Sequence, residues 1–587
     1  MLVVFAWPRF WAWWGGYETL GDAAVISLRA TDLPTSGFPM VGMPSSIGAW
    51  STVAYPFHPG PAVFWQMAPT AHLLGGGPGA LTGSFLLVGF FGWWMIRTAC
   101  RRFGPVAAPA AAAACILTAG MWPSTNPLLG TVPALATCFA AWSVLDDDRA
   151  AWPWLAAAAS FAVQADLAFL FPSLALVCVA AVHQLRRRRH TDESTSVEEP
   201  SPSARVHVRR TLVVLGVFWV LPIVEAIRND GGNVRELVKA ATAGIPVKGI
   251  GSALPAVAVM LVPALLTGPI IVRSWRGARR GRRAMLVTAL TAGVGTAVSQ
   301  AMVPVGNAPS LTLLPVVITL IFTVFTVATL TADHVIGSRE RRPLLLRRAA
   351  WGGFVVMVLG VAPTITGSSF AEEWYPAVRP LTDAIVSLPG TSYRLQPLSG
   401  ALGTRFSLGL AEATNRRGVN LRVDSGLERY LGPRHATTGR ESQALYVAFE
   451  SSTQPVRGAR LVGRWTDPGF DRRARAEIDR LVAAAVRRSR PVWASGANEF
   501  AVGTTVAAGG TGRARLDDDA LFDLGQRLVQ GTDQIRDLPD AVIAQLVADD
   551  MLELPGSAER LRDRLVRSRQ AGVVSVWVAD DQPPGRT

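Results

Sequence analysis

The chain has 587 residues, of which 50% are hydrophobic, and a formal net charge of +14. The arginine clusters behind this charge flank apolar runs, a bias that orients membrane proteins, so nucleic-acid binding is not expected. All four cysteines lie in or beside apolar runs, so no disulfide framework is indicated. The seven histidines are scattered and show no metal-ligand spacing, so the sequence implies no cofactor.

Residues 1–367 alternate long apolar runs with arginine clusters, which predicts a polytopic α-helical membrane domain. The first run is too short to span a bilayer unaided, which indicates either a truncated start or an interfacial belt of tryptophans. A Pro-rich segment at about 60–74 is a candidate re-entrant segment and is not counted among the crossings. The eleven expected crossings are about 1–14, 78–98, 106–122, 127–145, 151–165, 168–185, 211–227, 252–272, 284–303, 310–331 and 349–366.

The arginine-rich loops fix the expected orientation. The loops that follow about residues 98, 185, 272 and 331 fall on one side by parity, and the positive-inside rule makes that side cytoplasmic. The N-terminus is then cytoplasmic, in a multi-pass protein of the cell membrane. The cytoplasmic loop 186–210 is charged and rich in Ser, Pro and Glu, so we expect it to be disordered.

Residues 368–587 resemble an ordinary soluble sequence and lie outside the cell by the same parity. Helical and strand-like segments alternate there, which predicts an extracytoplasmic α/β domain. Helices are expected at about 408–417, 471–487, 520–529 and 541–549, and strands at 419–423, 444–449, 459–463 and 573–579.

Asp22 is the most informative acid, because it follows a Trp-rich apolar start at the point where the chain leaves the membrane. If residues 17–33 are helical, Glu18, Asp22, Arg29 and Asp32 share one face. That face is either a solvated surface with Arg29 screening three acids or a functional group of charges at the mouth of a bundle.

The sequence His58-Pro59-Gly60-Pro61 lies in a loop flanked by aromatic residues. Its prolines impose a fixed, non-helical path that presents His58 at the membrane surface. A loop that contacts a substrate and a structural entry to a helix, with His58 bonded locally, are equally consistent with this pattern.

Other polar residues are expected on the outer side. Asp166 interrupts an apolar hairpin, as an interfacial turn residue or as part of a site. Arg228, Arg235 and Lys239 lie on the outer segment 228–251, where cations break the charge asymmetry. They suggest either a phosphate-binding group or an exposed amphipathic helix.

Several short motifs occur in an order that resembles the C-type membrane glycosyltransferases (GT-C), most closely their actinobacterial members. The chain departs from that family's pattern at Asp166, where relatives carry His, and at 304–309, where they carry an Arg-containing motif. The motifs are Gly21-Asp22, His58–Pro61, Asn126-Pro127, Ser160–Gln164, Trp219–Pro222, Gly231–Asn233 and Arg417–Asp424.

The resemblance implies an inverting transfer of a sugar from a polyprenyl-phosphate donor to a cell-envelope glycan or lipid acceptor on the outer face. Asp22 matches the family's catalytic aspartate. Glu18, Arg29, His58, Asp166, Arg228, Arg235 and Lys239 are the candidate substrate-binding residues. The alternatives are a non-catalytic envelope-assembly scaffold and a transporter of lipid-linked glycan, which would need charges along a path through the bundle.

Overall fold

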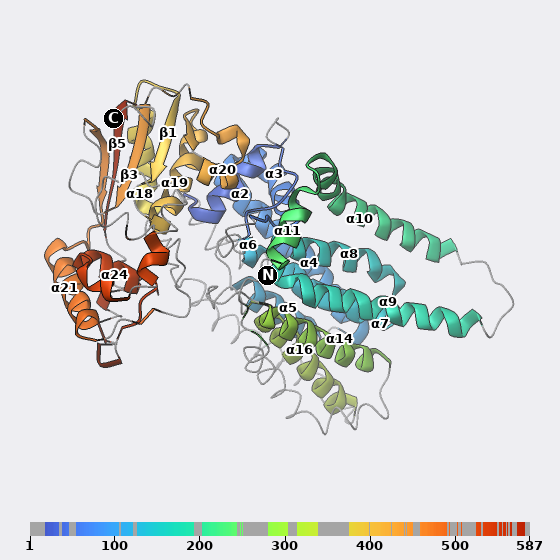
Figure 1. Cartoon of the computed structure of the whole chain (residues 1–587). Helices are drawn as coiled ribbons and strands as arrows, with labels where there is room; N and C mark the ends of the chain where they lie inside the picture. Colours follow the sequence, from blue (N-terminus) through green and yellow to red (C-terminus); the bar gives the residue numbers. More distant parts are fainter. Residues whose placement is uncertain are drawn as a thin grey trace. The chain divides into compact units, whose positions relative to one another are not determined.

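The computed structural model divides the chain into two compact units (Figure 1). The helical unit comprises Met1–Ala6, Met40–Gln66 and Leu81–Gly367, and the sheet unit comprises Trp7–Pro39, Met67–Ala80 and Ser368–Thr587. The described residues are 18–33, 38–45, 55–104, 107–120, 126–192, 202–242, 247, 249, 280–302, 314–337, 375–397, 400–423, 425–439, 441, 443–449, 458–489, 492–493, 502, 506, 524–529, 532–548, 551–554, 556–558, 560–561, 564–565 and 572–580.

The helical unit contains, within the described residues, four helices long and apolar enough to cross a membrane. The qualifying stretches are Gly76–Phe103, Leu167–Arg187, Arg205–Arg228 and Gly281–Ala301, and Thr131–Leu145 and Leu314–Leu330 are shorter apolar helices. This composition is that of a polytopic membrane protein. Helices α3 (Ala62–Leu74) and α4 (Gly76–Phe103) contain residues of both units, because Met67–Ala80 belongs to the sheet unit. The other helices of the helical unit are α5 (Ala107–Gly120), α6 (Asn126–Leu129), α7 (Thr131–Leu145), α8 (Trp152–Ala165), α9 (Leu170–Asp192), α10 (Pro202–Arg228), α11 (Gly232–Thr242), α14 (Arg280–Ala301) and α16 (Leu314–Gly337).

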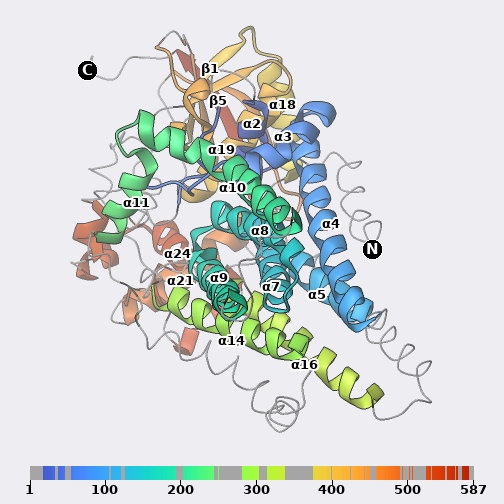
Figure 2. The same ribbon diagram turned by 90° about the vertical axis from the view of Figure 1, so that its right-hand side faces the viewer.

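Helix α7 is the centre of the bundle, and every one of its residues is buried. It packs against α5, α8, α9, α14 and α16 (Figure 2). Close approach of the outer helices needs small residues: a Cβ on Gly295 of α14 would lie 2.6 Å from the Cα of Pro172 in α9. Aromatic rings of Phe139, Phe322 and Phe325 fill the interior around α7.

The sheet unit holds a mixed five-stranded sheet in the order β2-β1-β3-β5-β4. Strand β1 (Ser392–Pro397) pairs in parallel with β2 (Asn420–Val423) and β3 (Gln443–Phe449), while β5 (Val573–Asp580) pairs antiparallel with β3 and β4 (Arg460–Thr466). Helices α18 (Tyr375–Val386) and α19 (Gly400–Asn415) pack against the sheet and against each other.

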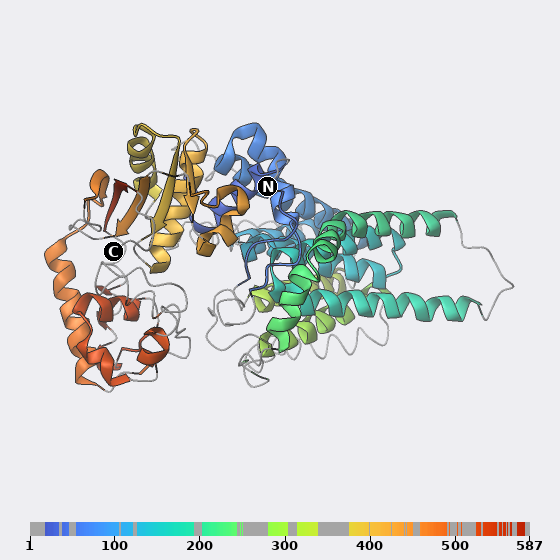
Figure 3. The same cartoon turned by 45° about the horizontal axis from the view of Figure 1, so that its top comes forward.

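Two further groups of helices belong to the sheet unit. Helix α2 (Gly21–Thr31) packs on α19 and on α20 (Ser425–Leu431). Helices α21 (Arg472–Arg488) and α24 (Asp540–Ala548) pack together (Figure 3) around a small core that includes Val482 and Ile543.

The expected α/β character of the C-terminal residues is confirmed, but the element boundaries differ. Strand β1 and helices α18 and α20 were not expected, and α19 begins at Gly400. Segment 60–74 forms helix α3 from Ala62. The range 186–210, predicted to be disordered, is helical up to Asp192 and from Pro202 onward, because arginines are good helix formers and proline suits a helix start.

The eleven crossings remain a prediction, because 1–14, 252–272 and 349–366 lie outside the described residues.

Candidate functional site

Asp22 lies in the first turn of α2, which begins at Gly21 with a φ of +52°. A carboxylate in the first turn interacts favourably with the exposed N–H groups of the helix. The helix begins at Gly21, so the predicted four-residue charged face does not form: Glu18 precedes the helix and Asp32 caps its C-terminus. Asp22 itself is half-buried, and the other α2 residues from Gly21 to Ala30 are buried.

Asp22 lies near Tyr430 of α20, and α2 begins beside Arg405 of α19. A Cβ on Gly21 would lie 3.5 Å from Cγ of Arg405 in α19. Burial raises the pKa of Tyr430 in α20, the Asp22 carboxylate raises it further, and Arg429 and Arg405 oppose the change. Asp22, Arg405 and Arg429 thus each lie close enough to Tyr430 to influence its charge, and we call these four residues of the sheet unit the Asp22 cluster.

The Asp22 cluster is open to solvent. Both arginines are exposed, and Tyr430 is 36% exposed. A half-buried carboxylate can accept a proton, and the adjacent guanidinium groups can stabilise a neighbouring anion. The cluster thus combines a possible base with possible anion-binding groups.

A buried network around Glu412 of α19 holds the residues that precede and form α2. Glu412 Oε1 accepts hydrogen bonds from Ser27 Oγ at 2.9 Å and from Gly77 N at 2.9 Å, and Oε2 accepts one from Thr19 Oγ1 at 3.1 Å. Arg416 Nε lies 3.0 Å from Oε1. Four donors therefore converge on one buried carboxylate.

Glu18, a predicted substrate-binding residue, belongs to the same network through an ion pair with Arg416. Its side chain is 9% exposed. Burial raises the pKa of Glu18; Arg416 lowers it, and the nearby Glu412 adds to the increase. Two buried carboxylates thus share one guanidinium, and Glu18 faces the interior.

Arg29 also points into the fold. Its Nη1 lies 3.0 Å from Asp32 Oδ2, and Asp32 Oδ1 lies 3.3 Å from Arg434 Nη1 and 3.6 Å from His435 Nε2. Burial lowers the pKa of Arg29, and Asp32 counteracts this effect. Gly432, which follows α20 and lies beside Arg29, has a φ of +84°, a backbone conformation that favours glycine.

His58 belongs to the helical unit and is 6% exposed, so the prediction that its loop presents the imidazole at the membrane surface is wrong. The reason is a second segment that pairs with the loop. His58 N donates to Met43 O at 2.8 Å, and Gly42 N donates to His58 O at 2.9 Å. This pairing fixes the backbone of the loop within the fold, and the His58 side chain is buried there.

Several of the short motifs named in the sequence analysis meet around this loop. Gln164 Oε1 accepts a hydrogen bond from Ala62 N at 3.2 Å, while its Nε2 donates to Phe218 O at 2.7 Å. Phe218 O is available because Pro222, four residues later, has no N–H. A Cβ on Gly60 would lie 2.2 Å from Gln164 Oε1, which explains the glycine.

The Gly231–Asn233 motif closes the same group of contacts. Asn233 Oδ1 accepts from Phe57 N at 2.7 Å, and Asn233 Nδ2 donates to Phe57 O at 3.0 Å. Glu225 Oε2 accepts from Asn233 N at 3.0 Å and so satisfies the start of α11. These motifs therefore build a structural junction between the His58 loop, α8, α10 and α11.

The remaining predicted residues have local partners or are exposed. Asp166 accepts a hydrogen bond from Ala168 N at 2.7 Å and caps a short helical turn. Arg228 is exposed at the end of α10. Arg235 lies 3.6 Å from Asp230, and Lys239 Nζ lies 2.7 Å from Glu236. Both cations lie on helix α11, and each has an acidic side chain within ion-pair distance.

The predicted residues fall into two groups. Asp22, Glu18 and Arg29 belong to the sheet unit, where the structure brings Asp22 together with residues that the sequence analysis missed. Arg405 and Tyr430 are distant in sequence and carry no motif, so no sequence signal pointed to them. The other five, in the helical unit, are His58, Asp166, Arg228, Arg235 and Lys239.

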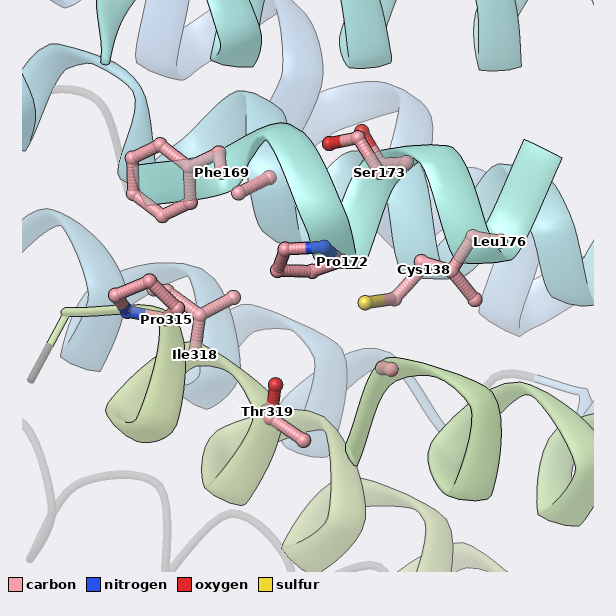
Figure 4. A pocket seen from close by; sticks show the side chains of 11 residues that line it. Cys138, Phe169, Pro172, Ser173, Leu176, Pro315, Ile318 and Thr319 are labelled. Carbon is pink, nitrogen blue, oxygen red and sulfur yellow. The ribbon is translucent and has the colours of Figure 1, made fainter. Parts of the chain in front are cut away.

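Within the part of the chain that the structure describes, no group of three or more His, Cys, Asp or Glu side chains is placed to hold a metal ion. A hollow of about 10 Å³ lies between α7, α9, α14 and α16, lined by Cys138, Phe169 and Thr319 among others (Figure 4). That space holds at most one water molecule, so it is a packing gap in the bundle.

No family model matches the chain, and no curated protein matches it. Its fold is similar to two crystal structures of ArnT from Cupriavidus metallidurans, one in the apo state and one bound to undecaprenyl phosphate. Each is 15% identical; the TM-scores are 0.47 and 0.46, and the alignments cover 78% of this chain and 95% and 96% of those chains. This likeness is too distant to assign a family or to transfer an activity.

Proposed function

We propose that the protein is a membrane glycosyltransferase that moves a sugar from a polyprenyl-phosphate donor to a cell-envelope glycan or lipid acceptor on the outer face. The observation that carries the proposal is the Asp22 cluster. The family resemblance assigns the catalytic carboxylate to Asp22, and Asp22 lies beside Tyr430, Arg405 and Arg429 at the solvent-open start of α2.

In the proposed reaction Asp22 accepts the proton of the acceptor hydroxyl while the hydroxyl oxygen attacks the anomeric carbon. The bond from that carbon to the phosphate oxygen breaks, and the lipid phosphate leaves as an anion. Attack opposite the leaving group inverts the anomeric centre. General-base assistance of this kind contributes about 10²–10⁴-fold to a rate.

The leaving phosphate needs cations, and the sheet unit supplies Arg405 and Arg429, which lie near the same Tyr430 as Asp22. They are further candidates for this role beside Arg228, Arg235 and Lys239, of which Arg235 and Lys239 are each within ion-pair distance of an acid. Preorganised cations stabilise charge that develops in a transition state.

The buried networks support this assignment by making the site rigid. Glu412 holds the chain on both sides of Asp22, through Thr19 and Ser27. Asp32, bound to Arg29, anchors the far end of α2. A catalytic group supported in this way keeps its geometry without reorganisation.

The test compares cells that lack the protein with cells that produce it as wild type, Asp22→Asn or Glu477→Gln. Glu477 pairs with Arg480 on the exposed face of α21 and is the matched loss of one carboxylate. Glycosidic linkages of the envelope would be analysed, and the folding of each variant checked by thermal unfolding. We expect Asp22→Asn to reproduce the deletion, and Glu477→Gln to resemble wild type.

One observation favours a non-catalytic scaffold as the second candidate. Asp166, where relatives carry His, accepts a hydrogen bond from its own turn. A scaffold predicts that Asp22→Asn restores the wild-type envelope in the deletion strain. The transporter alternative is less well supported, because Glu225, the charge nearest to a path through the bundle, caps α11.

A further inference from the structure

A second polar hollow lies at the C-terminal end of α4, within the helical unit and away from every residue discussed so far. Its volume is about 100 Å³, against about 10 Å³ for the hollow beside Cys138, so it has room for several water molecules. Drug-sized ligands need several times more space. The lining residues are Trp94, Arg97, Thr98, Arg101, Arg102, Asp148, Ala150, Ala151 and Trp154.

The exposed face of α4 shows where this hollow lies relative to lipid. Leu86, Phe90 and Trp93 are 57%, 53% and 53% exposed and recur at spacings of four and three residues, so they form one apolar stripe. Arg97 and Arg101 continue the same stripe and are also exposed. An apolar surface that ends in tryptophan and then arginine is typical of the boundary between hydrocarbon and headgroups.

The length of α4 agrees with that placement. Its 28 residues extend about 42 Å, which exceeds the roughly 30 Å of a hydrocarbon core. The last turns, which carry the arginines, therefore reach the headgroup layer on the side that the positive-inside rule makes cytoplasmic.

The charges in the hollow are unbalanced. Arg102 is bound to Asp146, and its Nη2 lies 3.5 Å from Asp148 Oδ2. Asp148 also accepts a hydrogen bond from Ala150 N at 3.1 Å, so both of its roles are structural. The guanidinium carbon of Arg97 lies 5.3 Å from the centroid of the Trp93 ring. Arg101 has no acidic partner among the described residues. Two cations therefore line one hollow.

The walls of the hollow are rigid and amphipathic. Trp94 and Trp154 stack with ring centroids 4.8 Å apart, and Phe90 lies 5.1 Å from Trp154. The buried Thr98 adds a hydroxyl donor beside the arginines. A phosphate could pair with both guanidinium groups while the chains of its lipid follow the stripe above.

We infer that Arg97, Arg101, Thr98 and the Trp94–Trp154 pair form a binding site for the phosphate headgroup of an anionic membrane lipid in the cytoplasmic leaflet. The site does not depend on the proposed glycosyl transfer. Phosphate is the shared chemistry of a lipid headgroup and a free ion, and the apolar stripe that leads into the hollow favours the lipid.

The full-length protein in detergent would be titrated with phosphatidylglycerol, phosphatidylcholine and inorganic phosphate, and binding followed by native mass spectrometry. The test variant is Arg97→Gln/Arg101→Gln. The control is Arg149→Gln/Arg186→Gln, which removes two exposed arginines of the same predicted side outside the hollow. The melting temperature of each variant would show that it folds.

We expect phosphatidylglycerol to bind more tightly than phosphatidylcholine, and the test variant to bind it about 30-fold more weakly while the control keeps wild-type affinity. Equal weakening by both variants would reveal a general surface-charge effect and overturn the site. Equal affinity for the two lipids would overturn the headgroup specificity. Binding of inorganic phosphate as tight as that of the lipid would show that the ligand is the free ion, and the lipid assignment would fail.

Discussion

The attachment of α2 to α19 depends on Glu412. Removing the Glu412 side chain should therefore release the segment that carries Asp22. In the Glu412→Ala variant Ser27, Thr19 and the Gly77 amide lose their acceptor, and Arg416 loses one of its two acidic partners among the described residues and keeps Glu18. Removing one partner of a buried ion pair typically costs about 3–5 kcal/mol. That cost corresponds to an increase of about 150- to 5,000-fold in the equilibrium constant for detachment of α2.

Hydrogen exchange measures this opening directly, because amides exchange when their segment detaches. We expect protection of the α2 amides to fall by the stated factor in Glu412→Ala, while the amides of β3 and β5 keep theirs. Glu477→Gln is the control, since an exposed pair contributes at most about 1 kcal/mol. Unchanged α2 protection, or an equal loss in β3 and β5, would refute the reasoning.

Two further predictions concern pH and packing. Because the pKa of Glu18 is raised above its ordinary 4.5, the folded state holds the proton more tightly than the unfolded state, and its contribution to stability falls as pH rises from about 4.5 through the folded pKa. Glu18→Gln should flatten this part of the curve of melting temperature against pH, and an unchanged slope would contradict the assigned cause. Gly295→Ala should destabilise the bundle by about 1–3 kcal/mol, since the new Cβ would meet the backbone of Pro172. Gly216→Ala, in α10 with open space around the glycine, should be neutral or stabilising by up to about 1 kcal/mol, and equal melting temperatures for the two variants would disprove the packing argument.

Local patterns predicted much of the secondary structure. The apolar runs located α5, α8 and α14 to within a few residues, because helix length and hydrophobicity are properties of contiguous residues. The spacing of apolar residues likewise located α21, where Asp471 accepts hydrogen bonds from two amides of the first turn. Strand β1 was missed because it is short and its parallel neighbours supply its partners from distant parts of the chain.

The order of the motifs pointed to Asp22, but only the tertiary structure determined its surroundings. Arg405 and Tyr430 come from two different helices of the C-terminal part of the chain, and nothing in their neighbouring residues marks them. His58 shows the opposite case: its flanking prolines predicted a rigid loop, but whether its side chain is exposed depended on pairing with Gly42 and Met43. Sequence patterns thus specify which segments are helical, apolar or rigid, because those properties depend on neighbouring residues. Burial and charge pairing depend on segments hundreds of residues apart, and only the folded chain brings those together.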